Sequence, residues 1–146
     1  GTRVGPISGQ DFRTFTLTGN ALTLTGPVTG MYFTAWNVDL KLETDVTLRG
    51  SDFHGALDLN GHNLTLLGLR THPPTSIDGT IVGTGTLTIE GGDSIITKPS
   101  SFSGTVYVQN TCELDGSMPD ANFVLLPEGN GEWGGARFWR VSAERL

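Results

Sequence analysis

Short stretches in which apolar and polar residues alternate recur along this chain. A five-residue pattern, apolar-Thr-apolar-x-Gly, occupies residues 22–26, 46–50, 64–68 and 87–91, and residues 112–116 form a degenerate fifth copy. Successive copies begin 18 to 25 residues apart. Repetition at about this period is typical of solenoids, in which each repeat buries its apolar face by stacking on the next.

A second apolar-polar-apolar triplet begins six to eight residues before each copy. These triplets begin at Phe15, Val38, Leu57 and Val106, and Ile81 begins a poorer match in the fourth repeat. Strict alternation over three to five residues indicates half-buried strands, because successive side chains point to opposite faces. Helical periodicity is absent. The sequence therefore predicts an all-β chain with two short strands in each repeat.

Two β architectures fit these strands. Asn60-Gly61 between two triplets is a signal for a hairpin, as in an antiparallel sandwich. A parallel β-helix explains the repeat better, because equivalent residues then stack from coil to coil. The expected outward stack is Thr23, Thr47, Thr65 and Thr88; the expected inward stacks are Leu24, Leu48, Leu66, Ile89 and Leu114, and Leu17, Leu40, Leu59 and Val108. We therefore expect a single-stranded parallel β-helix of about five to six coils.

The chain of 146 residues is expected to be one domain. Residues 1–131 hold the β-helix repeats, with residues 1–14 as an N-terminal cap. Residues 132–146 are rich in aromatic residues and arginine, unlike the repeats. We interpret them as a C-terminal cap that covers the last coil, with Phe138 or Trp139 against the core, or as a linker to a following segment.

Three segments carry a family resemblance. They are Gly-Thr-Gly-Thr-Leu-Thr-Ile-Glu-Gly at 83–91, Ser-Phe-Ser-Gly-Thr-Val-Tyr-Val at 101–108 and Leu-Asp-Gly-Ser-Met-Pro-Asp-Ala-Asn at 114–122. Together they resemble the passenger-associated β-strand repeat of bacterial autotransporter-type surface proteins, and residues 57–66 are similar to the segment that precedes it. The resemblance covers about residues 38–126. It implies a right-handed, pectin-lyase-like β-helix that serves as a scaffold without catalytic residues.

Two departures from that family pattern stand out. The last twenty residues do not match it, and Cys112 with Glu113 replaces the usual small residues. The departures leave open whether the chain comes from an autotransporter or from another surface or virion protein built of the same coils. In either case the resemblance implies a secreted or cell-surface location.

Composition narrows the choice of partners. The net charge of −6 argues against nucleic acid and anionic membranes as partners, because no polybasic patch is available. No apolar run approaches the roughly 18 residues of a membrane span. The chain opens without a signal peptide, which indicates a mature or excised fragment. Cys112, the single cysteine, is interpreted as a buried apolar residue.

Candidate chemistry is sparse. Asp39, Asp58 and His62 suggest a carboxylate–imidazole site of the kind that polysaccharide-degrading β-helices carry. The competing interpretation is structural, since Asn60-Gly61 beside His62 suits a tight corner. His54 and His72 have no acidic or cysteine partner at ligand spacing. We expect no catalytic residues, no metal site and no cofactor.

Aromatic residues give the binding candidates. Tyr32 and Trp36 share one strand face, and Met31, Phe33 and Ala35 share the other. If the second set faces the core, the first forms an aromatic strip that can stack on sugars or on a partner chain. Alternatively, Trp36 covers the open N-terminal end of the solenoid. Trp133 and Trp139 are further binding candidates.

Three functions remain on these grounds. The favoured one is a non-catalytic structural scaffold or adhesion segment of a secreted, cell-surface or virion protein, with a trimeric phage tail-spike segment as a variant. The second is a protein that binds or degrades polysaccharide. The third is an ice- or surface-binding protein, which the uneven repeat length disfavours. Glycans or another protein chain are the expected partners.

Overall fold

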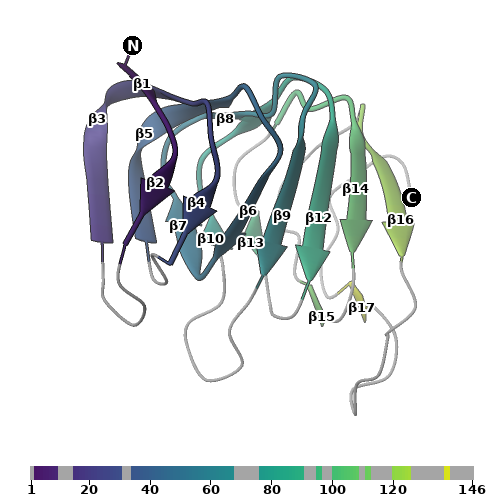
Figure 1. Cartoon of the computed structure of the whole chain (residues 1–146). Coiled ribbons are helices and arrows are strands. Elements are labelled where there is room, and N and C mark those ends of the chain that lie inside the picture. Colours follow the sequence, from purple (N-terminus) through teal and green to yellow (C-terminus); the bar gives the residue numbers. More distant parts are fainter. Residues whose placement is uncertain are drawn as a thin grey trace.

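The computed structural model describes residues 2–9, 15–30, 34–67, 76–90, 95–96, 100–108, 111–112, 120–125 and 137–138. These residues contain strands and no helix, and every strand pairing among them is parallel. The strands stack as successive coils of a β-solenoid (Figure 1). The predicted all-β parallel architecture is confirmed.

The solenoid has three faces, which the chain visits in the same order in each coil. Face A contains the first half of β3 (Phe15–Leu24), the first half of β5 (Thr34–Leu42), β7 (Ser51–Phe53), β10 (Ser76–Ile77) and β13 (Ile95–Ile96). Face B contains β1 (Thr2–Val4), the second halves of β3 and β5, β8 (Leu57–Asp58) and β11 (Ile81–Val82). Face C contains β2 (Ile7–Ser8), β4 (Val28–Thr29), β6 (Val46–Arg49), β9 (Asn63–Leu67), β12 (Thr86–Glu90), β14 (Thr105–Val108) and β16 (Asn122–Leu125).

Four coils are complete within the described residues, and partial coils lie at both ends. This is roughly consistent with the predicted five to six. Each coil, however, has three strands rather than the predicted two. In the coils that begin at Thr34, Ser51 and Ser76, the strand without a predicted triplet is that of face A, which has only two or three residues in β7 and β10. In the coil that begins at Phe15 it is the two-residue strand β4 of face C. In so short a strand, the alternation of apolar and polar residues covers too few positions to be recognised in the sequence.

The core runs along the inside of all three faces. Its residues stack from coil to coil, as in the face C row Val46, Leu64, Leu87, Val106 and Phe123 and the face A row Leu17, Trp36, Phe53 and Ile77. Leu64, Leu66, Leu87 and Ile89 have no exposed surface. Burying each such side chain stabilises the fold by about 1.5–3 kcal/mol.

The predicted stacks are correct in the middle of the chain. Thr47, Thr65 and Thr88 lie opposite one another on face C, and so do Leu48, Leu66 and Ile89. The predicted stacks are wrong at the N-terminal end, where Thr23 and Leu24 lie on face B, opposite Lys41 and Leu42. A repeat pattern gives the order of strands but not the face on which each one lies. Leu114 is outside the described residues.

The second predicted inward stack divides among the faces. Leu17 lies opposite Trp36 on face A, whereas Leu40 lies opposite Leu57 on face B. The register places Val108 on face C, opposite Ile89. Leu59 is buried at the end of face B. Only the inward direction of Leu40, Leu59 and the half-buried Leu17 is confirmed.

Asn60-Gly61 forms a corner and not a hairpin. Both residues have positive φ, 50° at Asn60 and 81° at Gly61, a region that Asn and Gly tolerate best. The flanking strands β8 and β9 belong to different faces and pair with other coils, not with each other. The antiparallel alternative is therefore wrong.

The corner between faces A and B depends on close backbone contact. A Cβ atom on Gly79 would lie 1.9 Å from the carbonyl oxygen of Gly55 in the preceding coil. No side chain fits at that distance, so only glycine allows these two coils to approach each other.

The two predicted end segments are described in part. Residues 2–9, within the predicted N-terminal cap 1–14, form β1 and β2 and begin a partial coil. In the C-terminal segment 132–146, Arg137–Phe138 (β17) pairs in parallel with Thr111–Cys112 (β15). The rest of that segment lies outside the described residues, so its role as a cap or a linker stays a prediction.

We predict that Leu66→Ala lowers the free energy of unfolding by about 2–5 kcal/mol, because it leaves a cavity between two stacked coils. Thr65→Ala, a change of the outward neighbour on the same strand, is the control and should cost less than about 1 kcal/mol. Urea denaturation followed by circular dichroism measures both. Equal costs for the two variants would contradict the inward stack.

Candidate functional site

Asp39, Asp58 and His62 do not form a common site. The Oδ1 atom of Asp39 accepts a hydrogen bond of 2.8 Å from the backbone N–H of Ala56, in the next coil. The Oδ1 atom of Asp58 accepts one of 2.9 Å from the N–H of Asn60. His62 instead faces a fourth residue, Asp45, with 3.6 Å between its Nδ1 atom and an Oδ1 atom. The structural interpretation of these residues fits the observed contacts.

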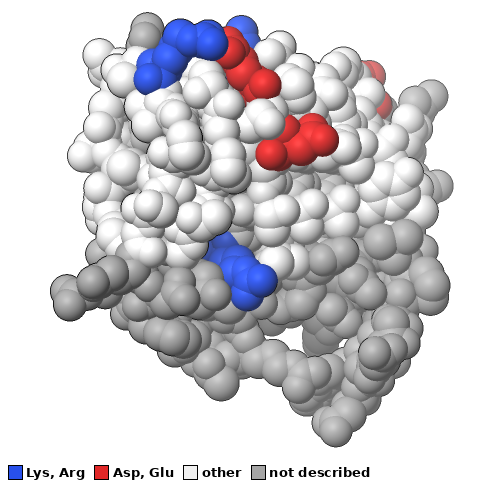
Figure 2. Space-filling view, in the orientation of Figure 1, with Lys and Arg blue, Asp and Glu red and all other residues white. Residues whose placement is uncertain are grey.

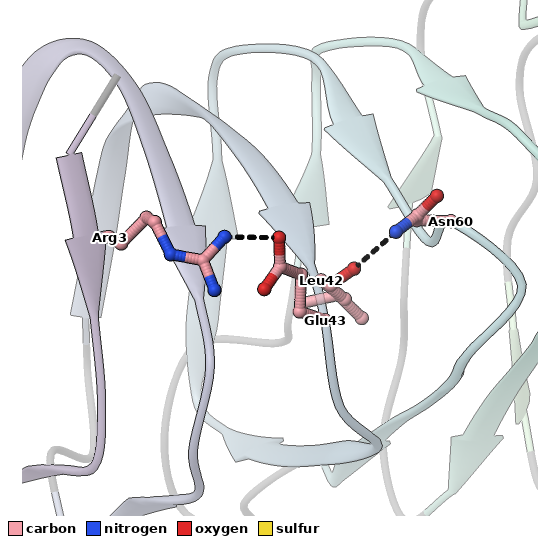
Figure 3. Close-up of polar contacts among 4 residues, drawn as sticks. All are labelled: Arg3, Leu42, Glu43 and Asn60. Carbon is pink, nitrogen blue, oxygen red and sulfur yellow. Dashed lines mark hydrogen bonds and ion pairs between the residues drawn. The ribbon is translucent and has the colours of Figure 1, made fainter.

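Polar side chains connect adjacent coils at several corners. Asp45 Oδ1 accepts from the backbone N–H of Asn63 at 2.9 Å, where β9 of the next coil begins. The Asn60 amide donates to the carbonyl oxygen of Leu42 at 3.1 Å, one coil back (Figure 3). The Ser100 hydroxyl accepts from the N–H of Ile81 at 2.8 Å. These side chains satisfy backbone groups that the turning chain leaves without a strand partner.

His54 has a partner that the sequence did not reveal. Its Nδ1 atom lies 2.9 Å from both carboxylate oxygens of Asp78, and both side chains are partly exposed. The two residues are 24 positions apart, about one coil, which is the spacing at which a solenoid brings residues together. The described residues contain no group of three or more His, Cys, Asp or Glu side chains able to hold a metal ion. His72 lies outside them.

An ion pair ties the partial first coil to the third coil. Arg3 on β1 donates through Nη1 to Oε1 of Glu43, 40 residues away, close to the Asn60–Leu42 bond (Figure 3). The hydrogen bond from Arg3 holds the pKa of Glu43 below its usual value, and the same bond raises the pKa of Arg3. Both side chains are partly exposed, so salt screens the pair.

The aromatic strip predicted at Tyr32 and Trp36 is wrong at Trp36. Trp36 has no exposed surface and stacks on Phe53, with 6.0 Å between ring centroids and 13° between ring planes. Alternate residues of β5 from Thr34 to Leu42 are all buried, so Trp36 is on the core face. Its ring lies between Leu17 and Phe53 within the stack and does not cover the N-terminal end.

The indole of Trp36 carries one unsatisfied group. Its Nε1–H has no hydrogen-bond partner, the single such buried side-chain atom among the described residues. The other three binding candidates, Tyr32, Trp133 and Trp139, lie outside the described residues, so their roles stay predictions.

Face C presents two outward rows of uncharged side chains, which we call the outer rows. The first contains Asn63, Thr86, Thr105 and Asn122, and the second contains Thr47, Thr65, Thr88, Tyr107 and Val124. Figure 2 shows this face largely free of charged residues. The sequence predicted the threonine part of the second row but not the first, because only the register shows that Thr86 and Thr105 lie side by side.

Comparison of the chain with protein-family models, with curated proteins and with solved structures gives no match. Among the residues that the structure describes, no helix is long and apolar enough to cross a membrane.

We predict that Glu43→Gln lowers stability at neutral pH and that its difference from the wild type disappears in acid. The folded-state pKa of Glu43 is depressed. Its contribution is therefore present above the unfolded value of about 4.3 and is lost as the pH falls through the folded value. Thermal melts at pH 7 and pH 3, each at low salt and at about 1 M salt, test this. A difference that persists at pH 3 would contradict the ion pair as its cause.

Proposed function

We propose that this chain is a non-catalytic structural scaffold, an adhesion segment of a secreted, cell-surface or virion protein. The observation that carries the proposal is the use of polar side chains at the corners. Asp39 and Asp45 each accept a backbone N–H from the next coil, and His54 pairs with Asp78 across coils. Within the described residues, these titratable groups are thus engaged in contacts between coils, which supports a structural role for them.

The proposal is favoured over a polysaccharide-degrading enzyme. Glycoside hydrolysis needs two carboxyl groups that flank one bond, about 5–9.5 Å apart, with one of them free to donate a proton. The Asp39 carboxylate accepts a hydrogen bond from the N–H of Ala56, just before β8, and the Asp58 carboxylate accepts one from the N–H of Asn60, just after β8. These contacts support a structural role for the two carboxylates over a catalytic one.

The location outside the cell rests on other grounds. The resemblance of residues 38–126 to the autotransporter passenger repeat supports it, as does the glycine-rich composition with only 16% charged residues. A β-solenoid suits such a location, since its length and its repeated outward rows present a surface to ligands.

We predict that the chain releases no reducing ends and no unsaturated products from a panel of neutral and acidic polysaccharides, because Asp39 and Asp58 are held as hydrogen-bond acceptors. Reducing-sugar and ultraviolet assays over a day measure this. Product formation by the wild type that Asp58→Asn abolishes would overturn the proposed function.

We also predict that Asp39→Ala costs about 1 kcal/mol, because the N–H of Ala56 loses its partner. Asp120→Ala, at an exposed position near β16, is the matched control and should change stability by less than about 0.5 kcal/mol. Denaturant titration measures both variants. If the two behave alike, the Asp39 carboxylate does not hold the coils together.

A further inference from the structure

The outer rows of face C differ from the outward residues of the other faces. Face B presents Arg3, Lys41 and Asp58, and face A presents Asp52. None of the nine residues of the outer rows has a side chain that is charged at neutral pH. Arg49 lies beyond them, at the end of β6. Asp45 directly precedes β6, beside Asn63. The outer rows themselves thus form an uncharged area in a chain with a net charge of −6, with single charged residues at its border (Figure 2).

The hydrogen-bonding groups of the outer rows are free. Within the described part of the chain, the hydroxyls of Thr65, Thr88 and Tyr107 have no intramolecular partner, and neither have those of Thr86 and Thr105. At the corners, in contrast, Asp39, Asp45, Asn60 and Ser100 are bonded within the protein. Face C therefore presents unused donors and acceptors in register.

The outer rows have a regular spacing. Strands β6, β9, β12, β14 and β16 pair without a register shift, so equivalent residues recur at about 4.8 Å along the solenoid axis. Threonine hydroxyls repeat at this spacing over Thr47, Thr65 and Thr88 in the second row. At the C-terminal end of the second row, Tyr107 lies opposite Val124, whose side chain is 38% exposed. The surface thus combines ordered hydroxyls with one apolar, aromatic position.

We propose that the outer rows of face C bind a neutral polysaccharide laid along the solenoid axis; this rests on the proposed adhesion function. A neutral sugar chain carries no charge, repeats along its length, and offers both hydroxyl groups and apolar ring faces. The hydroxyls bond to the threonine and asparagine side chains, and a ring face stacks on Tyr107.

Other occupants fit the outer rows less well. A nucleic acid or an anionic lipid surface needs cations that these rows lack. A second copy would bring hydroxyl rows against hydroxyl rows, with only Tyr107 and Val124 to form the apolar centre that a stable dimer requires. Ice needs a flat and uniform lattice match, which the Tyr107 ring interrupts.

The test uses the full chain and four neutral probes, namely insoluble cellulose and chitin in sedimentation assays and soluble mannan and dextran in affinity gel electrophoresis. Polygalacturonate serves as the acidic comparison. We expect the wild type to bind at least one neutral probe, with affinity that changes less than about twofold between low salt and 0.5 M NaCl, because no ion pair contributes.

Variants locate the binding surface. The double variant Thr65→Glu and Thr88→Glu should weaken binding at least about tenfold, through lost hydrogen bonds and added charge. Tyr107→Ala should weaken it about fivefold through lost stacking. Thr16→Glu is the matched control, because Thr16 is an exposed threonine on face A, and it should bind as the wild type does. Circular dichroism confirms that each variant is folded.

Several outcomes would overturn the proposal. They are no binding to any neutral probe, binding to polygalacturonate alone, and undiminished binding by the folded double variant. Dimerisation or inhibition of ice growth that the double variant abolishes, without polysaccharide binding, would assign the surface to another occupant. None of these results tests catalysis. Release of cleavage products would contradict the proposed non-catalytic function, but it would not contradict polysaccharide binding by the outer rows.

Discussion

Stacking of parallel strands in register is the constraint on which the rest of this structure depends. Strands in adjacent coils lie about 4.8 Å apart, so each residue must fit directly over its counterpart in the coil below. Inward positions therefore repeat as Leu48, Leu66 and Ile89, and a change of shape in one coil is felt by the next. The same constraint requires glycine at Gly55 and Gly79, where two backbones meet at a corner.

The constraint also divides the polar side chains into two groups. At the corners the chain leaves the strand ladder, and its backbone N–H groups need other partners. Asp39, Asp45 and Ser100 supply these partners from adjacent coils. Along the strands the ladder satisfies the backbone by itself, so the outward threonines of face C have no structural hydrogen bond to make. Their hydroxyl groups remain available to a ligand.

The sequence predicted the architecture better than the arrangement of its parts. Alternation with a repeat of 18 to 25 residues was enough to predict parallel stacking, and it placed Thr47, Thr65 and Thr88 correctly. The alternation could not assign Thr23 to a face, because strands on face B and strands on face C have the same alternation of apolar and polar residues. The side on which Trp36 lies was wrong for a related reason. Alternate residues of a strand point to opposite sides of the sheet, but the alternation does not tell which side is buried.

The contacts among polar residues were harder to predict from sequence. His54 and Asp78 are partners because one coil separates them, and the length of that coil depends on loops of variable size. No local pattern connects the two residues. The same holds for Thr86 and Thr105, which become neighbours only through the pairing of β12 with β14. In a solenoid, the register between strands thus decides which outward residues are neighbours on the candidate surface. A single sequence specifies that register only indirectly.

Near the N-terminus, one side chain makes a contact between coils that are not adjacent. Backbone bonds advance one coil at a time, from Glu43 N–H to Leu24 and from Thr25 N–H to Val4. Arg3 reaches past the intervening coil to Glu43 and connects the first to the third. Separation of the coil that holds β1 must therefore also break a contact with a coil that is not its direct neighbour.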